Sequence, residues 1–217
     1  FSKGFDVGAE SDLNVAWGLQ YHEEKFEMVA GQTESWANGG FANNGSLAHH
    51  GSGASVGANG FQGFSTDVPG RFDRQSSAGY LDLEVDLTDR WLLAGALRFE
   101  DFSDFGSTSK GKIATRFAVN ENFNVRGSFS SGLRAPSMGQ TNLQRASTGF
   151  SGGQLQESLT VAATNPIAAQ KGAMPLQPEE SVSFTLVVAF SLGDMDVTID
   201  WFNIQVDDRI ALTQQIE

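Results

Sequence analysis

Three carboxylates at alternate positions, Asp82, Glu84 and Asp86, are the side chains in this chain best suited to catalysis or metal binding. Side chains two apart on a β-strand point to the same face, so the three would line up along one side. Such a row could hold a metal ion or supply a carboxylate pair for acid–base catalysis, but either site also needs a pocket and shifted pKa values. The alternative is a water-exposed wall balanced by basic residues on nearby segments, and we favour it. Those basic residues are Arg98, Lys112, Arg116 and Arg126.

Other signals of catalysis or metal binding are weak. The chain has no cysteine, which excludes a disulfide framework, a zinc–thiolate site and a thiol nucleophile. His49 and His50 are adjacent and lack the spaced further ligands of a metal site, so a solvated loop is the simpler interpretation. The glycine-rich stretches contain no phosphate-binding P-loop motif. We predict no enzymatic activity, no resident cofactor and no metal site.

A long polar segment at residues 31–75 contains several aromatic residues, among them Trp36, Phe41, Phe61 and Phe64. This segment is rich in Gly, Asn and Ser, a composition that favours turns and cannot build its own core. The aromatic rings could stack on a ligand, or they could fix the loop to its neighbours. We take them as candidate substrate-binding residues and keep the second interpretation open.

The elements that would position these residues are β-strands with two different faces. Leu81, Leu83, Val85 and Leu87 alternate with the three carboxylates, which predicts a strand with one apolar and one charged side. The same alternation recurs in residues 13–21, 91–100, 110–119, 123–131, 182–192 and 195–208.

The lengths of the connections between these strands indicate the type of fold that the strands form. Short turns at residues 9–12, 88–90, 120–122 and 193–194 alternate with long connections at 31–75, 101–109 and 132–178. Eleven residues span about 36 Å, or about 26 Å when tilted by about 45°, close to the apolar band of an outer-membrane barrel. The pattern predicts an antiparallel transmembrane β-barrel with short periplasmic turns and long extracellular loops.

Composition narrows the function classes. The formal net charge of -12 argues against nucleic-acid binding, which needs a basic surface. The chain also lacks the run of about 20 apolar residues that a membrane-spanning helix requires. It begins at Phe1 without an initiator Met or a signal sequence. We therefore expect it to be one domain, residues 1–217, cut from a longer polypeptide.

Several motifs resemble those of TonB-dependent outer-membrane receptors. The most specific is Arg134-Ala135-Pro136-Ser137 in the context of residues 126–137. The other resembling segments are residues 13–21 (LNVAWGLQY), 97–108 (LRFEDFSDFGST), 178–181 (PEES) and 199–204 (IDWFNI).

This resemblance implies a barrel of about 22 strands plugged by an N-terminal domain. Such a receptor lies in the outer membrane of a Gram-negative bacterium, surrounded by lipid. It binds a scarce nutrient, such as siderophore-bound iron, cobalamin or an oligosaccharide, at the extracellular loops. It imports that nutrient with energy from the TonB complex, which contacts a region N-terminal to the barrel. About eight strand segments are visible here, counting a partial one at residues 1–7, so we expect residues outside this chain to complete the barrel. The seven charged residues introduced above would line the lumen.

Two alternatives from other classes remain. One is a small, passive outer-membrane barrel, because eight strands are the minimum for such a protein. The other is a secreted carbohydrate-binding β-sandwich, which would bury Val182, Phe184 and Leu186 in a water-soluble core.

Overall fold

The structure is a computed structural model that describes residues 1–37, 57–58, 61–68, 70–151 and 154–213; side chains are described outside residues 148–157. The chain divides into two compact units. Residues 1–23, 74–135 and 177–210 form the first, which we name the sheet unit. Residues 24–73, 136–176 and 211–217 form the second, the loop unit.

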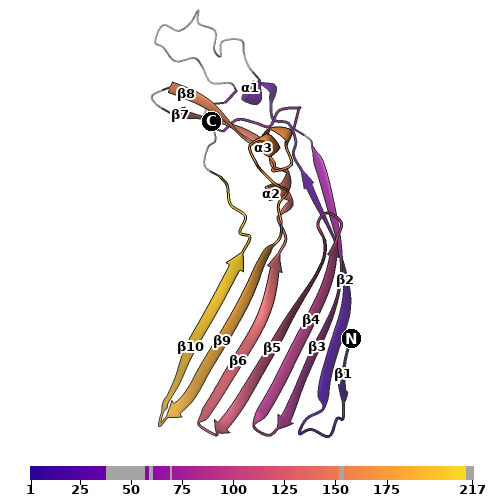
Figure 1. Ribbon diagram of the computed structural model, residues 1–217, viewed down its shortest axis with the longest axis vertical. Helices are drawn as coiled ribbons and strands as arrows, with labels where there is room; N and C mark the ends of the chain where they lie inside the picture. Colours follow the sequence, from indigo (N-terminus) through magenta and orange to yellow (C-terminus); the bar gives the residue numbers. More distant parts are fainter. Residues whose placement is uncertain (38–56, 59–60, 69, 152–153, 214–217) are drawn as a thin grey trace, which may run out of the picture. The chain divides into compact units, whose positions relative to one another are not determined.

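Eight strands form one sheet in the order β1-β2-β3-β4-β5-β6-β9-β10 (Figure 1). Their bounds are Ser2–Phe5 (β1), Leu13–Glu27 (β2), Arg71–Thr88 (β3), Trp91–Phe102 (β4), Gly106–Asn120 (β5), Phe123–Arg134 (β6), Glu179–Leu192 (β9) and Met195–Asp207 (β10). Each strand lies beside the next strand of the sheet along the chain, and the pairs with a recorded register are antiparallel. The predicted all-β antiparallel architecture is confirmed.

The register places the predicted apolar side chains on one face of the sheet. One row across β3, β4, β5, β6 and β9 is Leu83, Gly95, Ile113, Phe129 and Phe184. A shift of one residue would turn the whole apolar set of a strand to the other face, so matched alternation on neighbouring strands excludes such a slip.

No second layer covers this apolar face within the described residues. Val182, Phe184 and Leu186 are 44%, 41% and 40% exposed, and few apolar residues among the described ones are buried, such as Met28, Ala78, Val85 and Met138. A water-soluble sandwich would bury its inward face against another sheet. The β-sandwich alternative is therefore wrong.

The sheet is open within this chain. β1 and β10 are its two end strands, and they do not pair with each other. Unpaired strand edges are not tolerated in a lipid bilayer, because their N–H and C=O groups have no water to bind. The eight strands alone thus do not form the closed barrel that the alternative of a small, passive outer-membrane barrel requires.

The connection between β4 and β5 is shorter than expected. Residues 101–109 were predicted to be a loop, but β4 ends at Phe102 and β5 begins at Gly106, which leaves three residues between them. Gly106 adopts a φ of 91°, a conformation that favours glycine. The hydroxyl of Ser107 also donates to Asp101 at 2.6 Å. Turn chemistry therefore overrides the polar composition that suggested a loop.

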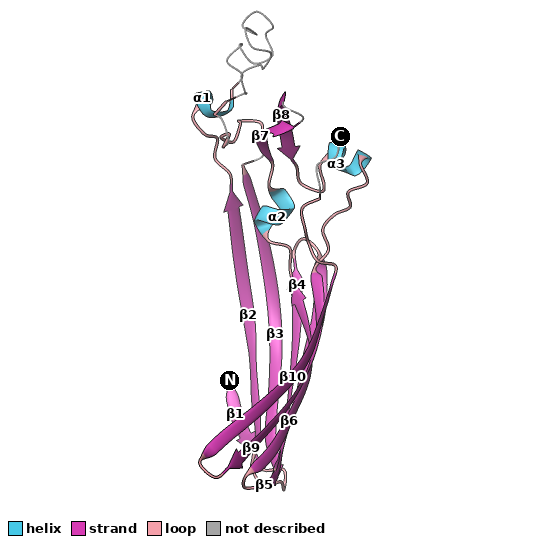
Figure 2. Ribbon diagram, turned by 90° about the vertical axis from the view of Figure 1, so that its left-hand side faces the viewer, coloured by secondary structure: helices cyan, strands magenta, loops and turns pink. Residues whose placement is uncertain are grey.

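The long connections also contain more regular structure than predicted (Figure 2). β3 begins at Arg71, inside the segment assigned to the first loop. The elements of the loop unit are α1 (Thr33–Trp36), α2 (Met138–Asn142), β7 (Arg145–Ser151), β8 (Gln154–Thr160) and α3 (Pro166–Gln170). β7 and β8 pair as an antiparallel hairpin.

Local capping explains the two later helices. Ser137 and Gln140 form a reciprocal capping box at α2, and Asn165 caps α3 ahead of Pro166. Among the described residues, no helix has the length and apolar character needed to cross a membrane.

Candidate ligand-binding wall

The polar face of the sheet carries two recesses, both within the sheet unit. The larger, about 410 Å³, lies on the half of the strands nearer the long connections. We name it the cationic recess because Arg98, Lys110 and Lys112 line it, together with Tyr80, Asp82 and Glu100. The smaller, about 220 Å³, lies nearer the short turns and is lined by Arg116 and Arg126. We name it the arginine recess.

In the cationic recess, two of the three basic side chains already have acidic partners. The Arg98 guanidinium lies 2.9 Å from the Glu100 carboxylate, and Lys110 lies 2.9 Å from Glu180. Lys112 makes no hydrogen bond or ion pair with any residue that the structure describes. Ala96 separates Lys112 from Asp82 in the cross-strand row, and its short side chain leaves space between the two charges. The recess therefore offers the ammonium group of Lys112 to a ligand, whereas the charges of Arg98 and Lys110 are screened by their acidic partners.

Tyr80 reaches this wall because β2 carries a glycine beside it. A Cβ atom on Gly18 would collide with the Tyr80 hydroxyl and ring. The sequence pattern did not single out either residue, because a lone Gly within an apolar alternation resembles any other small strand residue. The useful signal was a Tyr on the charged parity of β3, directly before the three alternating carboxylates.

A second group of side chains fixes the turn between β4 and β5. The guanidinium of Arg74, which is 3% exposed, donates two hydrogen bonds to Asp104 at 2.8 and 2.6 Å. Its Cζ lies 5.4 Å from the centre of the Phe105 ring, and Phe105 stacks on Phe102 at 4.3 Å. This arrangement, which we name the Arg74 clamp, holds the short turn against β3. It was missed because Arg74 lay in a segment predicted to be loop.

Glu179 organises the start of β9, three residues before the apolar alternation begins at Val182. It accepts a hydrogen bond from the backbone N–H of Ile210 at 2.9 Å and one from Arg134, its cross-strand partner, at 3.0 Å. The Ile210 hydrogen bond, and then the Arg134 side chain, hold the pKa of Glu179 below its ordinary value of 4.5. The carboxylate thus connects Ile210, which follows the end of β10, to β6 and β9.

The charged residues predicted to line the lumen share the polar parity of the sheet, but they are only partly brought together. Arg116 lies 3.8 Å from Asp86, and Arg116 stands directly opposite Arg126 in the register. Asp82 and Glu84 form no recorded ion pair with a described residue. The acids therefore lie on β3 and the bases on β4, β5 and β6, and among these seven residues only Asp86 and Arg116 approach within 4 Å. Their role as lumen wall stays a prediction.

The predicted loop aromatics occupy different environments within the loop unit. The Trp36 indole N–H donates to the Gly31 carbonyl at 3.1 Å. Phe61 is 80% exposed, with the Arg145 guanidinium 5.1 Å from its ring centre, and Phe64 is half-buried. The Trp36 contact fits a role in fixing the loop, whereas the exposure of Phe61 leaves its ring available to a ligand. The fourth aromatic, Phe41, and the pair His49 and His50 lie outside the described residues.

Solved structures with this fold include two siderophore receptors and a receptor for ferric enterobactin. PirA of Acinetobacter baumannii is 18% identical, with a TM-score of 0.63 over 96% of this chain and 26% of its own. PirA of Pseudomonas aeruginosa is 15% identical, with a TM-score of 0.64 over 94% of this chain and 30% of its own. PfeA of Pseudomonas aeruginosa, a mutant solved in complex with enterobactin, is 13% identical, with a TM-score of 0.61 over 95% and 26%.

These identities show the fold, and the chain spans less than a third of the length of those receptors. The comparison with curated proteins gave no match. The family model for the TonB-dependent receptor-like β-barrel, in contrast, matches residues 2–216. The two-faced open sheet, the Arg134–Ser137 segment and this match agree: the chain belongs to the TonB-dependent receptor family and is part of its β-barrel.

Proposed function

We propose that this chain, as one domain spanning residues 1–217, contributes part of the barrel of an outer-membrane receptor. That receptor binds a scarce nutrient and imports it with energy supplied through TonB. The single observation that carries the proposal is the sheet with one uncovered apolar face and one charged face, in a chain that belongs to this family. In a closed barrel the first face contacts lipid and the second lines the lumen. The function is transport, without bond chemistry.

The cationic recess gives the ligand a chemical class. Lys112 presents an ammonium group, Arg98 and Lys110 lie beside it paired with Glu100 and Glu180, and Tyr80 adds an aromatic ring with a hydroxyl group. Such a surface favours an anionic ligand with hydrogen-bond acceptors. The similar solved proteins are named siderophore and ferric enterobactin receptors, which supports an iron chelate over cobalamin or a neutral oligosaccharide. The loop aromatics Trp36, Phe61 and Phe64 are proposed as secondary contacts.

Cell fractionation and uptake test the receptor proposal. The complete native protein should be extracted from the outer membrane with detergent. Uptake of its ligand should stop in cells that lack TonB, while binding to the cell surface persists. Recovery of the native protein in the soluble fraction would contradict the proposal, and so would TonB-independent uptake.

Ligand binding to the cationic recess needs a matched set of variants. We would measure binding of a ferric catecholate, a ferric hydroxamate, cobalamin and a malto-oligosaccharide to the wild type and to the triple variant R98Q/K110Q/K112Q. Loss of charge-assisted hydrogen bonds should weaken binding of the anionic chelate about tenfold or more. R90Q, in the exposed turn 88–90, is the control and should bind normally. Equal affinity in the triple variant and the control would remove this recess from the ligand path.

A further inference from the structure

We propose that Arg116 and Arg126 form an anion site that takes a carboxylate group. The two residues stand directly opposite each other in the register of β5 and β6. Side chains in such a pair have their Cβ atoms about 4.5–5.5 Å apart, and like charges there destabilise the sheet. Two facing arginines therefore leave a local excess of positive charge on the polar face, which a bound anion would neutralise.

The partners available within the described residues do not neutralise this pair. Asp86 approaches Arg116 only to 3.8 Å, well beyond the distance of about 2.7–2.9 Å for a charge-assisted hydrogen bond. Arg126 donates from Nε to the neutral amide of Asn124 at 3.2 Å. No ion pair of Arg126 with any described carboxylate is recorded. One arginine is thus weakly paired and the other is paired only with a neutral group.

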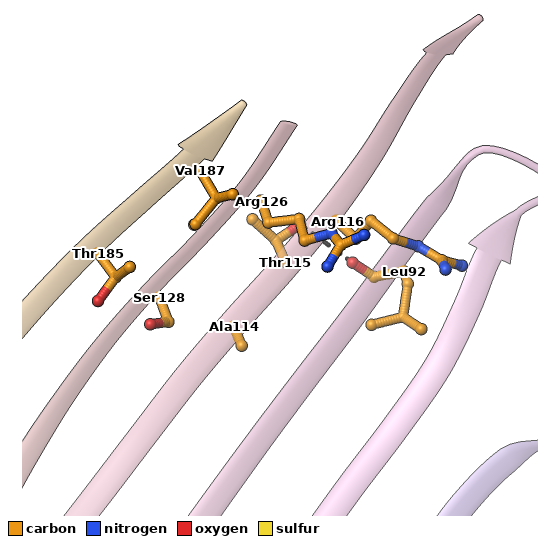
Figure 3. A pocket seen from close by; sticks show the side chains of 9 residues that line it. Leu92, Ala114, Thr115, Arg116, Arg126, Ser128, Thr185 and Val187 are labelled. Atoms are coloured by element: carbon orange, nitrogen blue, oxygen red, sulfur yellow. Dashed lines mark hydrogen bonds between the residues drawn. The ribbon is translucent and has the colours of Figure 1, made fainter. Parts of the chain in front are cut away.

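The surroundings leave room for a compact anion. The arginine recess measures about 220 Å³, and short side chains line it beside the two arginines: Ala114, Ser128 and Thr185. Figure 3 shows both arginine side chains extended in the same direction, from their own strands toward Leu92 on β4. A guanidinium presents its N–H donors as a planar fork that matches a carboxylate in two-point contact. Two such forks on neighbouring strands can both donate to one carboxylate.

The carboxylate could come from a side chain of polypeptide packed against the polar face or from a free small molecule in the lumen. Both sources present the same group to the same two forks. Neither depends on which nutrient the cationic recess accepts, because the two recesses are lined by different residues. The site would therefore stand even if the proposed ligand class proved wrong.

Residue-resolved arginine labelling tests the site on the complete native protein in detergent. Phenylglyoxal reacts with accessible guanidinium groups, and mass spectrometry of the digest gives a rate for each arginine. Rates for Arg116 and Arg126 would be compared with the rate for Arg90 in an exposed turn, with and without sodium citrate as the carboxylate probe. The variant R126Q and its charge-conserving counterpart R126K would be labelled in parallel.

Two outcomes support the site and identify its source. If a protein carboxylate occupies it, Arg116 should react about tenfold more slowly than Arg90 without citrate, and R126Q should restore fast labelling. If the source is a free carboxylate, both arginines should react rapidly and millimolar citrate should slow them, with protection lost in R126Q and partly kept in R126K. Labelling at the Arg90 rate in every condition would overturn the proposal. Slow labelling that R126Q leaves unchanged would do the same, because it would indicate steric shielding.

Discussion

The two faces of the sheet are built from the same strands but follow different rules. On the apolar face, bulky and small residues alternate between strands, so that Leu97 covers Gly111 and a Cβ there would lie 3.2 Å from the leucine. On the polar face, charges are separated by alanine and serine, and several have no close partner among the described residues. The apolar face is thus suited to continuous contact with an apolar environment, and the polar face leaves some of its charged side chains available to a ligand. We therefore propose that the polar face determines ligand specificity, whereas the apolar face needs only to be compatible with its surroundings.

The strongest effect should come from placing a charge on the apolar face. Leu186 lies in the middle of the apolar alternation of β9, and L186R should destabilise the complete barrel by about 2–4 kcal/mol in lipid vesicles. The control is S183R, on the polar face of the same strand, which should change stability by less than about 0.5 kcal/mol. Urea unfolding measures both. Equal losses would show that the two faces do not differ in this way.

The Arg74 clamp tests whether some charges on the polar side are structural. D104N keeps the shape of the side chain but removes its charge from the hydrogen bonds with a guanidinium that is 3% exposed. We expect a loss of about 1.5–3 kcal/mol, together with faster hydrogen exchange at residues 103–105. D89N, in the exposed turn 88–90, is the control. A loss no larger than that of D89N would show that the clamp contributes nothing.

The hydrogen bond between Trp91 and Thr115 on the apolar face gives a finer test of the difference between the two faces of the sheet. The Trp91 indole N–H donates to the Thr115 hydroxyl at 2.8 Å, on a face where lipid could not replace the acceptor. T115V should therefore cost about 0.5–1.5 kcal/mol. In a W91F background the same substitution should cost clearly less, which a double-mutant cycle would measure. Additive losses would show that the two side chains act independently.

The smallest effect concerns pH and the carboxylate of Glu179. The pKa of Glu179 is lower in the folded protein than in the unfolded chain. The ionised carboxylate therefore stabilises the fold fully at pH values above its unfolded-state pKa, and this stabilisation is lost as the pH falls through its folded-state pKa. The stability difference between the wild type and E179Q should therefore be largest near neutral pH and should shrink below the ordinary value of 4.5. Urea midpoints at several pH values measure it. A difference that stays constant across this range would rule out the linkage.

The order of residues along the chain was enough to assign side chains to the two faces. Alternation at period two is a local property of an extended chain. The apolar parity of Leu83 and Ile113 and the polar parity of Asp82 and Lys112 therefore follow from the sequence pattern alone. The Arg134–Ser137 segment likewise placed the chain in its family. These features need no knowledge of which strands are neighbours.

Which charged residues meet, in contrast, depends on the folded sheet. β6 pairs with β9 across the whole segment 135–178, and Arg74 reaches Asp104 from a strand that the local composition assigned to a loop. The facing of Arg116 and Arg126 depends on the turn at residues 121–122, because a different turn length would slide one arginine past the other. Contacts between residues far apart in sequence are set by the register and by the turns. For that reason, the alternation of side chains predicted the polar face of the sheet, but the tertiary structure was needed to locate the two recesses on that face.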